Sequence, residues 1–305
     1  MEKAIAKSKK RKFKNLPLFM IALPGIVYLL INNYIPMFGI FLAFKNYSLR
    51  KGVFGSDWCG LQNFQFLFKT KDAWIMTRNT ILYNVAFIII GTIVAIAIAV
   101  MMCELGKKTR VKFFQAALLL PNLLSWVVIG FIAYAFLNAD TGFINKTILA
   151  GLGLDPVSWY SYTGAWPAII IIVNLWKNMG YQSIVYMASI SGIDKSIYEA
   201  AAIDGCNRAQ IIAKVILPAV RPGFTTVIAY AFITCWNEYL LSYTLLTDQK
   251  KFPISVGLKY LVGEYSTDYS ALAAGCIIAL IPPILLFAYV QKHLVSGMNA
   301  GAVKG

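Results

Sequence analysis

Six long apolar stretches constrain this chain more than any other feature of its sequence. Each is close to the roughly 20 residues that an α-helix needs to cross a lipid bilayer. They cover residues 17–42, 80–103, 113–137, 165–190, 223–246 and 270–291. Pro121 lies inside the third stretch and Pro282–Pro283 inside the sixth, so we expect kinks at both places. The pattern predicts an all-α membrane protein with six transmembrane helices.

The composition agrees with a chain that is buried in lipid. Hydrophobic residues make up 59% of the 305 residues and charged residues only 13%, whereas soluble domains carry about 25%. The net charge of +15 does not indicate nucleic-acid binding, because the basic residues lie at the ends of the apolar stretches. The five cysteines contain no C-x-x-C pair and His293 is the only histidine, so we predict no metal site.

The distribution of basic residues predicts that both ends of the chain are cytoplasmic. With the N-terminus inside, the inner segments carry seventeen Lys and Arg residues and the outer loops carry ten. The expected organisation is a basic cytoplasmic N-terminus at residues 1–15, a transmembrane domain at 16–292 and a cytoplasmic tail at 293–305. The first apolar stretch is too long for a cleaved signal peptide, so it is expected to remain as a span.

Two of the predicted outer loops have a distinctive composition. Residues 45–79 are rich in aromatic side chains, which favours a position at the outer membrane surface; contact with an external partner is the alternative. Residues 138–164 carry little charge and many small or aromatic side chains. This second loop is predicted to form an ordered outer cap and not a soluble domain.

The inner loop at residues 191–222 is predicted to form two short helices with a sharp turn between them. Ser191 with Asp194 fits a capping pattern that opens the first helix. Asp204–Gly205 is suited to end it, because glycine is favoured just past the end of a helix. Helices this short need packing partners. Folding back onto the spans and docking in a groove of another protein are equally compatible with these residues.

The second helix of this loop has its own cap and an apolar face. Asn207 with Gln210 is a cap at its start, and Pro218 is expected to end it. The residues that repeat at helical spacing are Ile211, Ile212, Val215 and Ile216. We expect this face to rest on the core formed by the spans.

A longer pattern in the same loop resembles a known family. The positions are Glu199-Ala200-Ala201, Gly205, Val215 and Leu217-Pro218. In type and spacing they resemble the EAA loop of ABC importer permeases, in which isoleucine is usual at the position of Val215. The resemblance implies the type I importer permease fold and a loop that docks on a separate ATPase subunit. The implied coupling residues are Tyr198, Glu199, Ala200, Ala201, Asp204 and Gly205, with Leu217 and Pro218 as a structural stop.

Further segments resemble the carbohydrate uptake group of these permeases. The segment LPGIVYLLINNYIPMFGIFLAFKNY and the following WCGLQNFQFLF are similar to the first span of polysaccharide-type members. The segment that runs from Trp236-Asn237-Glu238 through KFPISVGL to the tail HLVSGMNAGAVKG is more similar to the partner permease of maltose-type systems. The resemblance implies import of a sugar or oligosaccharide across the bacterial plasma membrane by alternating access. It also implies that residues 301–305 can reach between the two ATPase subunits, and it leaves both positions in the permease pair open.

The resemblance also implies the partners of the chain. They are a second permease subunit, two ATPase subunits that bind ATP-Mg, an extracytoplasmic sugar-binding protein and membrane lipid. The sequence contains no phosphate-binding G-x-x-x-x-G-K-[ST] loop. We therefore expect a transport subunit that binds no cofactor and is not itself an enzyme.

Polar residues inside the predicted spans are candidates for the substrate path. Lys177 in the fourth stretch and Glu238 in the fifth are costly in a membrane and usually functional. Sugars are bound by hydrogen bonds and by stacking on aromatic rings. The predicted path residues are Lys177, Asn174, Asn178, Trp236, Asn237, Glu238 and Tyr239. Two structural alternatives remain, in which Lys177 and Glu238 neutralise each other or Asn237 bridges two helices.

Other classes of membrane protein fit the sequence less well. An ion-coupled secondary transporter is expected to show inverted repeats with broken helices at matching positions, and none is visible. A membrane enzyme is expected to gather His, Asp or Glu side chains in one plane. An ABC permease for a solute other than sugar is the closest alternative.

Overall fold

The computed structural model describes residues 16–105, 107–263 and 267–302, and these residues are mostly helical. The chain divides into two compact units, described separately below. The first contains residues up to 67 together with 262–277, and the second contains residues 68–261 and those from 278 onward. The predicted cytoplasmic N-terminus and residues 303–305 of the tail lie outside the described residues.

The first unit begins with a continuous helical stretch, Leu16–Phe44, in the place of the first predicted span. It consists of α2 (Leu16–Leu29), the π-helical η1 (Leu30–Tyr34), α3 (Ile35–Met37) and the 3₁₀-helical η2 (Phe38–Phe44). Pro36 lies in the first turn of α3, where a missing N–H costs little. The apolar side chains of α2 are exposed in this chain, as expected of a helix whose surroundings are lipid or another subunit.

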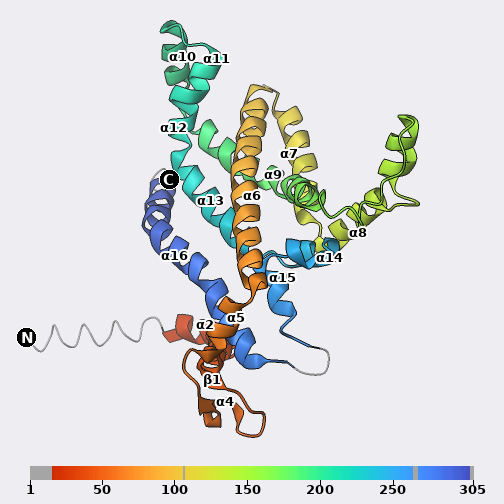
Figure 1. The fold of residues 1–305 in the computed structure, drawn as a ribbon. Helices are drawn as coiled ribbons and strands as arrows, with labels where there is room; N and C mark the ends of the chain where they lie inside the picture. Colours follow the sequence, from red (N-terminus) through yellow and green to blue (C-terminus); the bar gives the residue numbers. More distant parts are fainter. Residues whose placement is uncertain (1–15, 106, 264–266, 303–305) are drawn as a thin grey trace, which may run out of the picture. The chain divides into compact units, whose positions relative to one another are not determined.

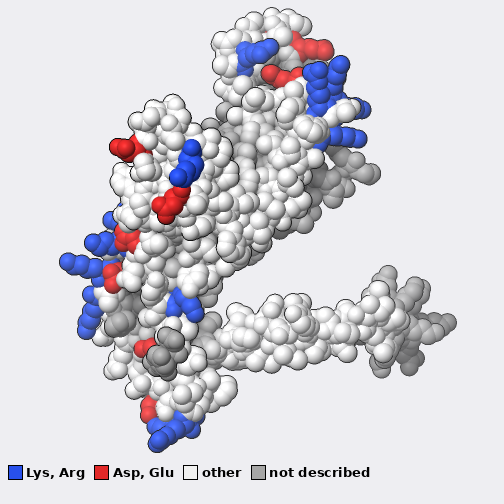
Figure 2. Space-filling view, turned by 90° about the vertical axis from the view of Figure 1, so that its right-hand side faces the viewer, with Lys and Arg blue, Asp and Glu red and all other residues white. Residues whose placement is uncertain are grey.

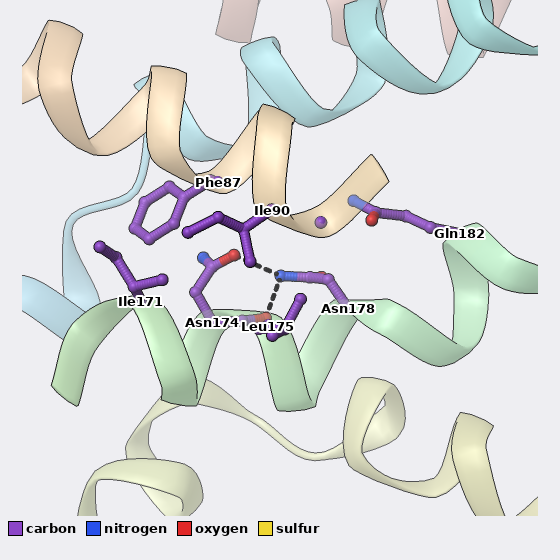
Figure 3. Close-up of a pocket in the computed structure, with 8 residues that line it drawn as sticks. Phe87, Ile90, Ile171, Asn174, Leu175, Asn178 and Gln182 are labelled. Atoms are coloured by element: carbon purple, nitrogen blue, oxygen red, sulfur yellow. Dashed lines mark hydrogen bonds between the residues drawn. The ribbon is translucent and has the colours of Figure 1, made fainter. Parts of the chain in front are cut away.

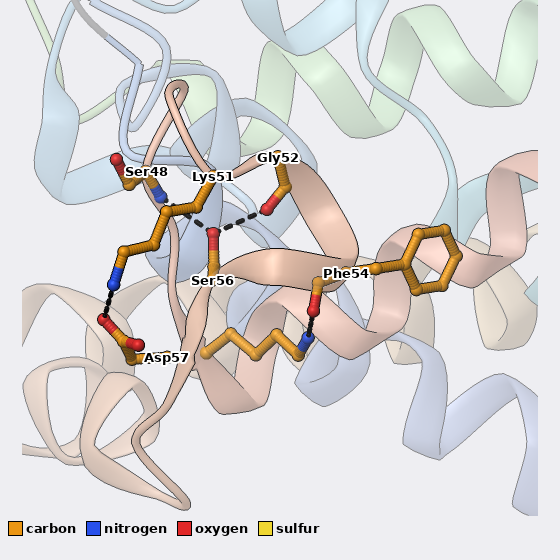
Figure 4. Close-up of polar contacts among 7 residues, drawn as sticks. Ser48, Lys51, Gly52, Phe54, Ser56 and Asp57 are labelled. Carbon is orange, nitrogen blue, oxygen red and sulfur yellow. Dashed lines mark hydrogen bonds and ion pairs between the residues drawn. The ribbon is translucent and has the colours of Figure 1, made fainter.

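A small hairpin follows this stretch in the first unit. Strand β1 (Lys45–Asn46) pairs antiparallel with β2 (Asp57–Trp58), and α4 (Gly52–Gly55) lies between them. The Lys45 ammonium donates to the carbonyls of Val53 and Phe54, and Lys51 pairs with Asp57 at 2.5 Å (Figure 4). The hairpin is therefore ordered by its own lysines, and it leaves the Phe54 ring exposed.

The second unit is built around long helices (Figure 1). The central helix α6 (Lys71–Glu104) packs against α9 (Trp166–Ser191) and α13 (Arg221–Trp236), and α9 also packs against α7 (Lys108–Leu123). Two clusters of buried apolar residues fill the space between these helices. One contains Trp166, Leu241 and Val256, and the other contains Ala95, Ala99 and Tyr186.

The third predicted span is broken near Pro121, and the expected kink there is confirmed. Helix α7 ends at Leu123, α8 (Trp126–Leu137) begins after two intervening residues, and the two axes differ by 97°. The Ser125 side chain caps α8 by accepting the Val128 N–H at 3.3 Å. In contrast, α16 (Tyr269–Ala302) continues as one helix through Pro282 and Pro283.

Three described helical segments are long and apolar enough to cross a membrane, namely Leu16–Phe44, α6 and Tyr269–Tyr289. The bent pair of α7 and α8 adds a fourth if it counts as one span. Helix α9 has the length, but its polar residues lower its mean hydropathy. Helix α13 is interrupted before the short α14 (Leu240–Leu245). A count of six spans and the orientation of the termini therefore remain predictions.

The loop at residues 138–164 is ordered, as predicted for an outer cap. The buried Asn145 side chain, in η3 (Ile144–Leu149), connects its parts. Its Nδ2 donates to the carbonyls of Ala139 and Val157, both at 2.9 Å, and its Oδ1 accepts from the Trp159 ring N–H at 3.1 Å. One amide thus satisfies main-chain groups from both ends of the loop. Helix α5 (Gln62–Lys69), η5 (Gln249–Lys251) and α15 (Ile254–Lys259) complete the described helices.

Candidate functional site

The inner loop forms the predicted pair of short helices. Helix α10 (Lys195–Ile203) and α11 (Arg208–Ile211) are separated by a turn at Gly205, which has φ +74°. The Gly205 N–H donates to the Ala202 carbonyl and the Cys206 N–H to the Ala201 carbonyl, which is the Schellman arrangement of a helix end. The expected role of glycine at this position is confirmed.

The caps of these helices differ in one respect from the prediction. Asn207 and Gln210 form a reciprocal capping box at the start of α11, as predicted. Ser191 does not cap α10, because it is the last residue of α9. The Asp194 carboxylate caps α10 instead by accepting the Ser196 N–H at 3.0 Å, and this hydrogen bond lowers the pKa of Asp194 below its ordinary value.

Pro218 does not end the helical path, which corrects the structural stop assigned to Leu217 and Pro218. The chain continues from α11 through the π-helical η4 (Ile212–Ile216) into α12 (Leu217–Ala219) and then α13. Pro218 lies in the first turn of α12, where its missing N–H and fixed φ are tolerated. Ile216 is buried and Ile212 packs beside it, so the apolar face of the second helix rests on the core, as expected.

Helix α10 has one buried side and one exposed side. Tyr198 packs against the cluster around Ala95 and Tyr186, and this burial raises the pKa of the Tyr198 phenol, with a smaller contribution from Cys103. The exposed residues on the other side include Ile197, Glu199, Ala200 and Ile203. Ile203, which was not among the predicted residues, is 86% exposed on this side, whereas Tyr198 is half-buried.

The other residues predicted to couple the chain to an ATPase lie around this exposed side. Ala201 is buried beneath it, while Asp204 and Gly205 are exposed at the turn. Arg208 approaches Glu104 at the end of α6, with 3.9 Å between the charged atoms. Figure 2 shows charged side chains gathered at the top of the view, where α10 and α11 lie, and a largely white surface below them. Ile197, Ala200 and Ile203 thus form a small exposed apolar surface, bordered by charged side chains, at one end of the unit. This surface is called the α10 ridge below.

Lys177 is buried in the second unit, and the structure gives it partners on another helix. Its ammonium donates to the carbonyls of Pro121 at 3.3 Å, Asn122 at 3.0 Å and Leu124, at the end of α7. It also lies 5.0 Å from the centre of the Trp126 ring, within the range of a cation–π contact. Lys177 is 7% exposed, so these groups replace the water that a lysine normally requires.

Glu238 is buried at the break between α13 and α14. Its carboxylate accepts the Leu241 N–H at 2.5 Å and the Ser242 N–H and hydroxyl at 3.2 and 2.7 Å. Among the described residues, the ion pairs are Lys51–Asp57 and Arg208–Glu104. The structure thus does not bring Lys177 and Glu238 together as an ion pair, and each charge is paired with the backbone at a helix break.

Asn174 and Asn178 lie on the side of α9 that faces α6. Figure 3 shows them beside Gln182, around a small cavity that Phe87 and Ile90 border from α6. The Asn178 amide donates to the carbonyl and the side-chain oxygen of Asn174 at 3.0 and 3.2 Å. These amides place a row of polar side chains on the side of α9 that faces α6.

Trp236, Asn237 and Tyr239, which precede α14, have three different surroundings. The Trp236 ring is buried and donates to the Ala279 carbonyl at 2.9 Å. The Asn237 amide is exposed and donates to the Ile233 carbonyl of its own helix, and it is not seen to bridge two helices. Tyr239 stacks on Tyr243 with 5.0 Å between ring centres.

Two exposed tyrosines near these residues were not predicted. Tyr181 and Tyr230 are 40% and 42% exposed, and their rings lie 5.2 Å apart across α9 and α13. A signal was present in the sequence, because Tyr181 follows Lys177 by one helical turn and Tyr230 precedes Asn237 by two. No group of three or more His, Cys, Asp or Glu residues in the described part of the chain is placed to hold a metal.

Comparison with known proteins identifies the family of this arrangement. Residues 73–300 match the family described as "Binding-protein-dependent transport system inner membrane component". The protein LplB of Bacillus subtilis is 27% identical over 90% of this chain and 88% of its own length. The polygalacturonan/rhamnogalacturonan transport system permease YteP of the same organism is 30% identical over 67% of this chain and 63% of its own length.

A solved structure shows the same fold. A chain of a bacterial alginate ABC transporter, in complex with an alginate pentasaccharide-bound periplasmic protein, superimposes with a TM-score of 0.79. It is 26% identical, and the match covers 94% of this chain and 95% of that one. The type I permease fold expected from the inner loop is thus shared with this solved chain.

Proposed function

Because the chain belongs to the family of binding-protein-dependent transport system inner membrane components, we propose that it is the permease subunit of an ATP-driven importer of a sugar or oligosaccharide. The observation that carries this proposal is the EAA-type loop, whose helix α10 is packed by Tyr198 on one side and exposed on the other. A self-contained transporter has no need of such a surface. The similarity to a polygalacturonan/rhamnogalacturonan transport system permease and to an alginate ABC transporter favours a sugar as the substrate.

The proposed assembly follows from the same surface. A second permease subunit completes the membrane part, and two ATPase subunits bind ATP-Mg on the cytoplasmic side. The exposed side of α10 docks on one ATPase through Ile203 and Glu199. Six spans cross the bacterial plasma membrane with both ends inside, and the loop at residues 191–222 is the coupling loop of the domain at 16–292. An external binding protein delivers the sugar to the outer loops.

We place the substrate path beside the breaks of α7–α8 and α13–α14. The proposed wall contains Asn174, Asn178, Trp236, Asn237, Glu238 and Tyr239, and the buried Lys177 lies behind it. Tyr181 and Tyr230 extend it with exposed rings that can stack on a sugar. During alternating access, movement of α10 is transmitted to these helices through the cluster around Tyr186.

The test is a pull-down of the chain from detergent-solubilised native membranes. Wild type is compared with Glu199→Arg, with Ile203→Asp and with the control Ala209→Asp, an exposed position of α11 outside the α10 ridge. We expect an ATPase and a second permease with wild type and the control, and loss of the ATPase with the two α10 variants. Recovery of the chain alone, or an ATPase that stays bound in both α10 variants, would contradict the coupling role.

The substrate class is tested with the purified complex in proteoliposomes. We expect ATP-dependent uptake of labelled oligosaccharides in the presence of the binding protein, and no uptake of labelled amino acids or peptides. Uptake of an amino acid or peptide instead of a sugar would support the proposal that the chain belongs to an importer and contradict the proposal that its substrate is a sugar.

A further inference from the structure

At the break between α7 and α8, the last main-chain carbonyls of α7 have no further helical turn to donate hydrogen bonds to them. The last carbonyls of an α-helix have no partner within the helix and carry partial negative charge. Here the chain turns by 97° after Leu123, so the next turn that normally covers them points elsewhere. Inside a membrane, such groups require another donor.

Lys177 supplies that donor from a different helix. A lysine ammonium has three N–H groups, and here it contacts three carbonyls, those of Pro121, Asn122 and Leu124. The Trp126 ring, in the first turn of α8, covers the ammonium at 5.0 Å. The side chain is therefore bound by the end of one half-helix and the start of the next, in the way that a carbonyl site binds a free cation.

The helix that carries Lys177 is itself fixed against α7. Asn122 donates to the Asn178 side-chain oxygen at 3.5 Å, one residue beyond Lys177. The ammonium is therefore presented from a packed helix, and its position fixes where α7 can end.

The break also determines the position of α14. Helix α8 packs against α14, and at Gly130 an added Cβ would lie 3.1 Å from the Thr244 hydroxyl. Helix α14 starts at the second break, where Glu238 satisfies its first N–H groups. A change in the direction of α8 therefore moves α14 and the residues before it.

We propose that Lys177 is a positioning residue, whose ammonium serves as the tethered cation of a carbonyl site and fixes the break between α7 and α8. Through α8 it fixes the place of α14 beside the translocation path. This inference rests on the proposed transport function, and it assigns to Lys177 an action on the backbone and not on the sugar.

The test uses the complete transporter, with its partner permease, ATPases and binding protein, in proteoliposomes. Maximal uptake and the half-saturating sugar concentration are measured for Lys177→Met, Lys177→Ala and Lys177→Arg, with Lys146→Met as a control at an exposed lysine of the outer cap. We expect Met and Ala to lower maximal uptake about tenfold, with half-saturation changed by less than about twofold. Lys177→Arg retains a cation, so its maximal uptake is expected to fall less than that of Lys177→Met or Lys177→Ala.

Chemical rescue separates a missing cation from a general structural defect. Propylammonium in the assay buffer is expected to restore uptake to Lys177→Ala, which leaves room for it, but not to Lys177→Met, whose side chain fills the space. Wild type with propylammonium controls for effects of the amine elsewhere. A raised half-saturating concentration with normal maximal uptake, or no rescue of the Ala variant, would overturn the inference.

A distance measurement keeps the inference testable if no sugar is found to be transported. Spin labels at Thr109 and Phe136, exposed positions of α7 and α8, report the bend directly in the full chain. The distance between them is expected to change in Lys177→Met and to be retained in Lys177→Arg. An unchanged distance in Lys177→Met would refute the positioning role whatever the substrate is, whereas absence of uptake by wild type would refute only the transport proposal.

Discussion

Gly180 of α9 lies directly against the main-chain carbonyl of Leu118 in α7, and a Cβ at this glycine has no room. Because that neighbour is backbone, a larger residue has to push the two helices apart. We predict that Gly180→Ala lowers the stability of the protein by about 1–3 kcal/mol, measured as a lower melting temperature in detergent.

The control for this substitution is Gly151→Ala, because nothing lies within 4 Å of the position that its Cβ would take. It is expected to leave the melting temperature nearly unchanged. Equal effects of the two substitutions would show that α7 and α9 do not pack as closely as described.

Replacing Glu238 tests its role as the cap of α14. Glu238→Ala leaves two N–H groups and the Ser242 hydroxyl without their acceptor in a buried place. We expect a loss of roughly 2 kcal/mol or more, and a smaller loss for Glu238→Gln, which keeps one acceptor oxygen. Thermal unfolding in detergent measures both, with the exposed Glu199→Gln as control. Loss of uptake without loss of stability would instead indicate direct contact with substrate.

The turn after α10 requires a residue with positive φ. Gly205 has φ +74°, so Gly205→Ala is expected to cost about 1 kcal/mol and to loosen the end of the helix. We predict weaker binding of the ATPase in the pull-down described above. Gly205→Asn should bind more nearly as wild type does, because asparagine adopts this conformation more easily. Identical binding by all three chains would mean that the turn does not matter for docking.

The cap of α10 predicts a pH dependence. Folding lowers the pKa of Asp194 from its ordinary value of 3.8, so the cap contributes stability above that pH. The contribution is lost as the pH falls through the lowered pKa. Hydrogen–deuterium exchange of the first α10 amides, corrected for the intrinsic rate at each pH, should show protection that is present above pH 3.8 and is lost at some pH below it.

Asp194→Asn provides the comparison for this experiment. Asparagine caps a helix without titrating, so protection in this variant should not follow the same acid transition. A transition of equal size in both proteins would assign it to another group.

Much of the helical framework was predictable because it depends on local sequence. Apolar length set the positions of α6 and α9, and a proline in the third stretch set the break that follows α7. Gly205 and the pair Asn207–Gln210 act on the backbone within four residues, so their effects are visible in the sequence itself.

The partners of the buried charges were not predictable in the same way. Lys177 binds carbonyls that are more than 50 residues away and become available only because α7 stops there. Pro218 was expected to end a helix. The π-helical turn η4 before it places Pro218 in the first turn of α12, where a residue without an N–H is tolerated. Which side of α10 faces outward was decided by the packing of Tyr198, and periodicity alone does not reveal it.

The inner side of helix α10 carries one aromatic ring, Tyr198, beside the small buried Ala201. The Tyr198 ring packs against a cluster that contains alanines of α6 and Tyr186 of α9. If α10 docks on an ATPase as proposed, a force applied to its outer side reaches α6 and α9 through this ring. In the proposed importer, the size and rigidity of that ring would set how much of the movement is transmitted, and the chemistry of the outer surface would set which subunit applies the force.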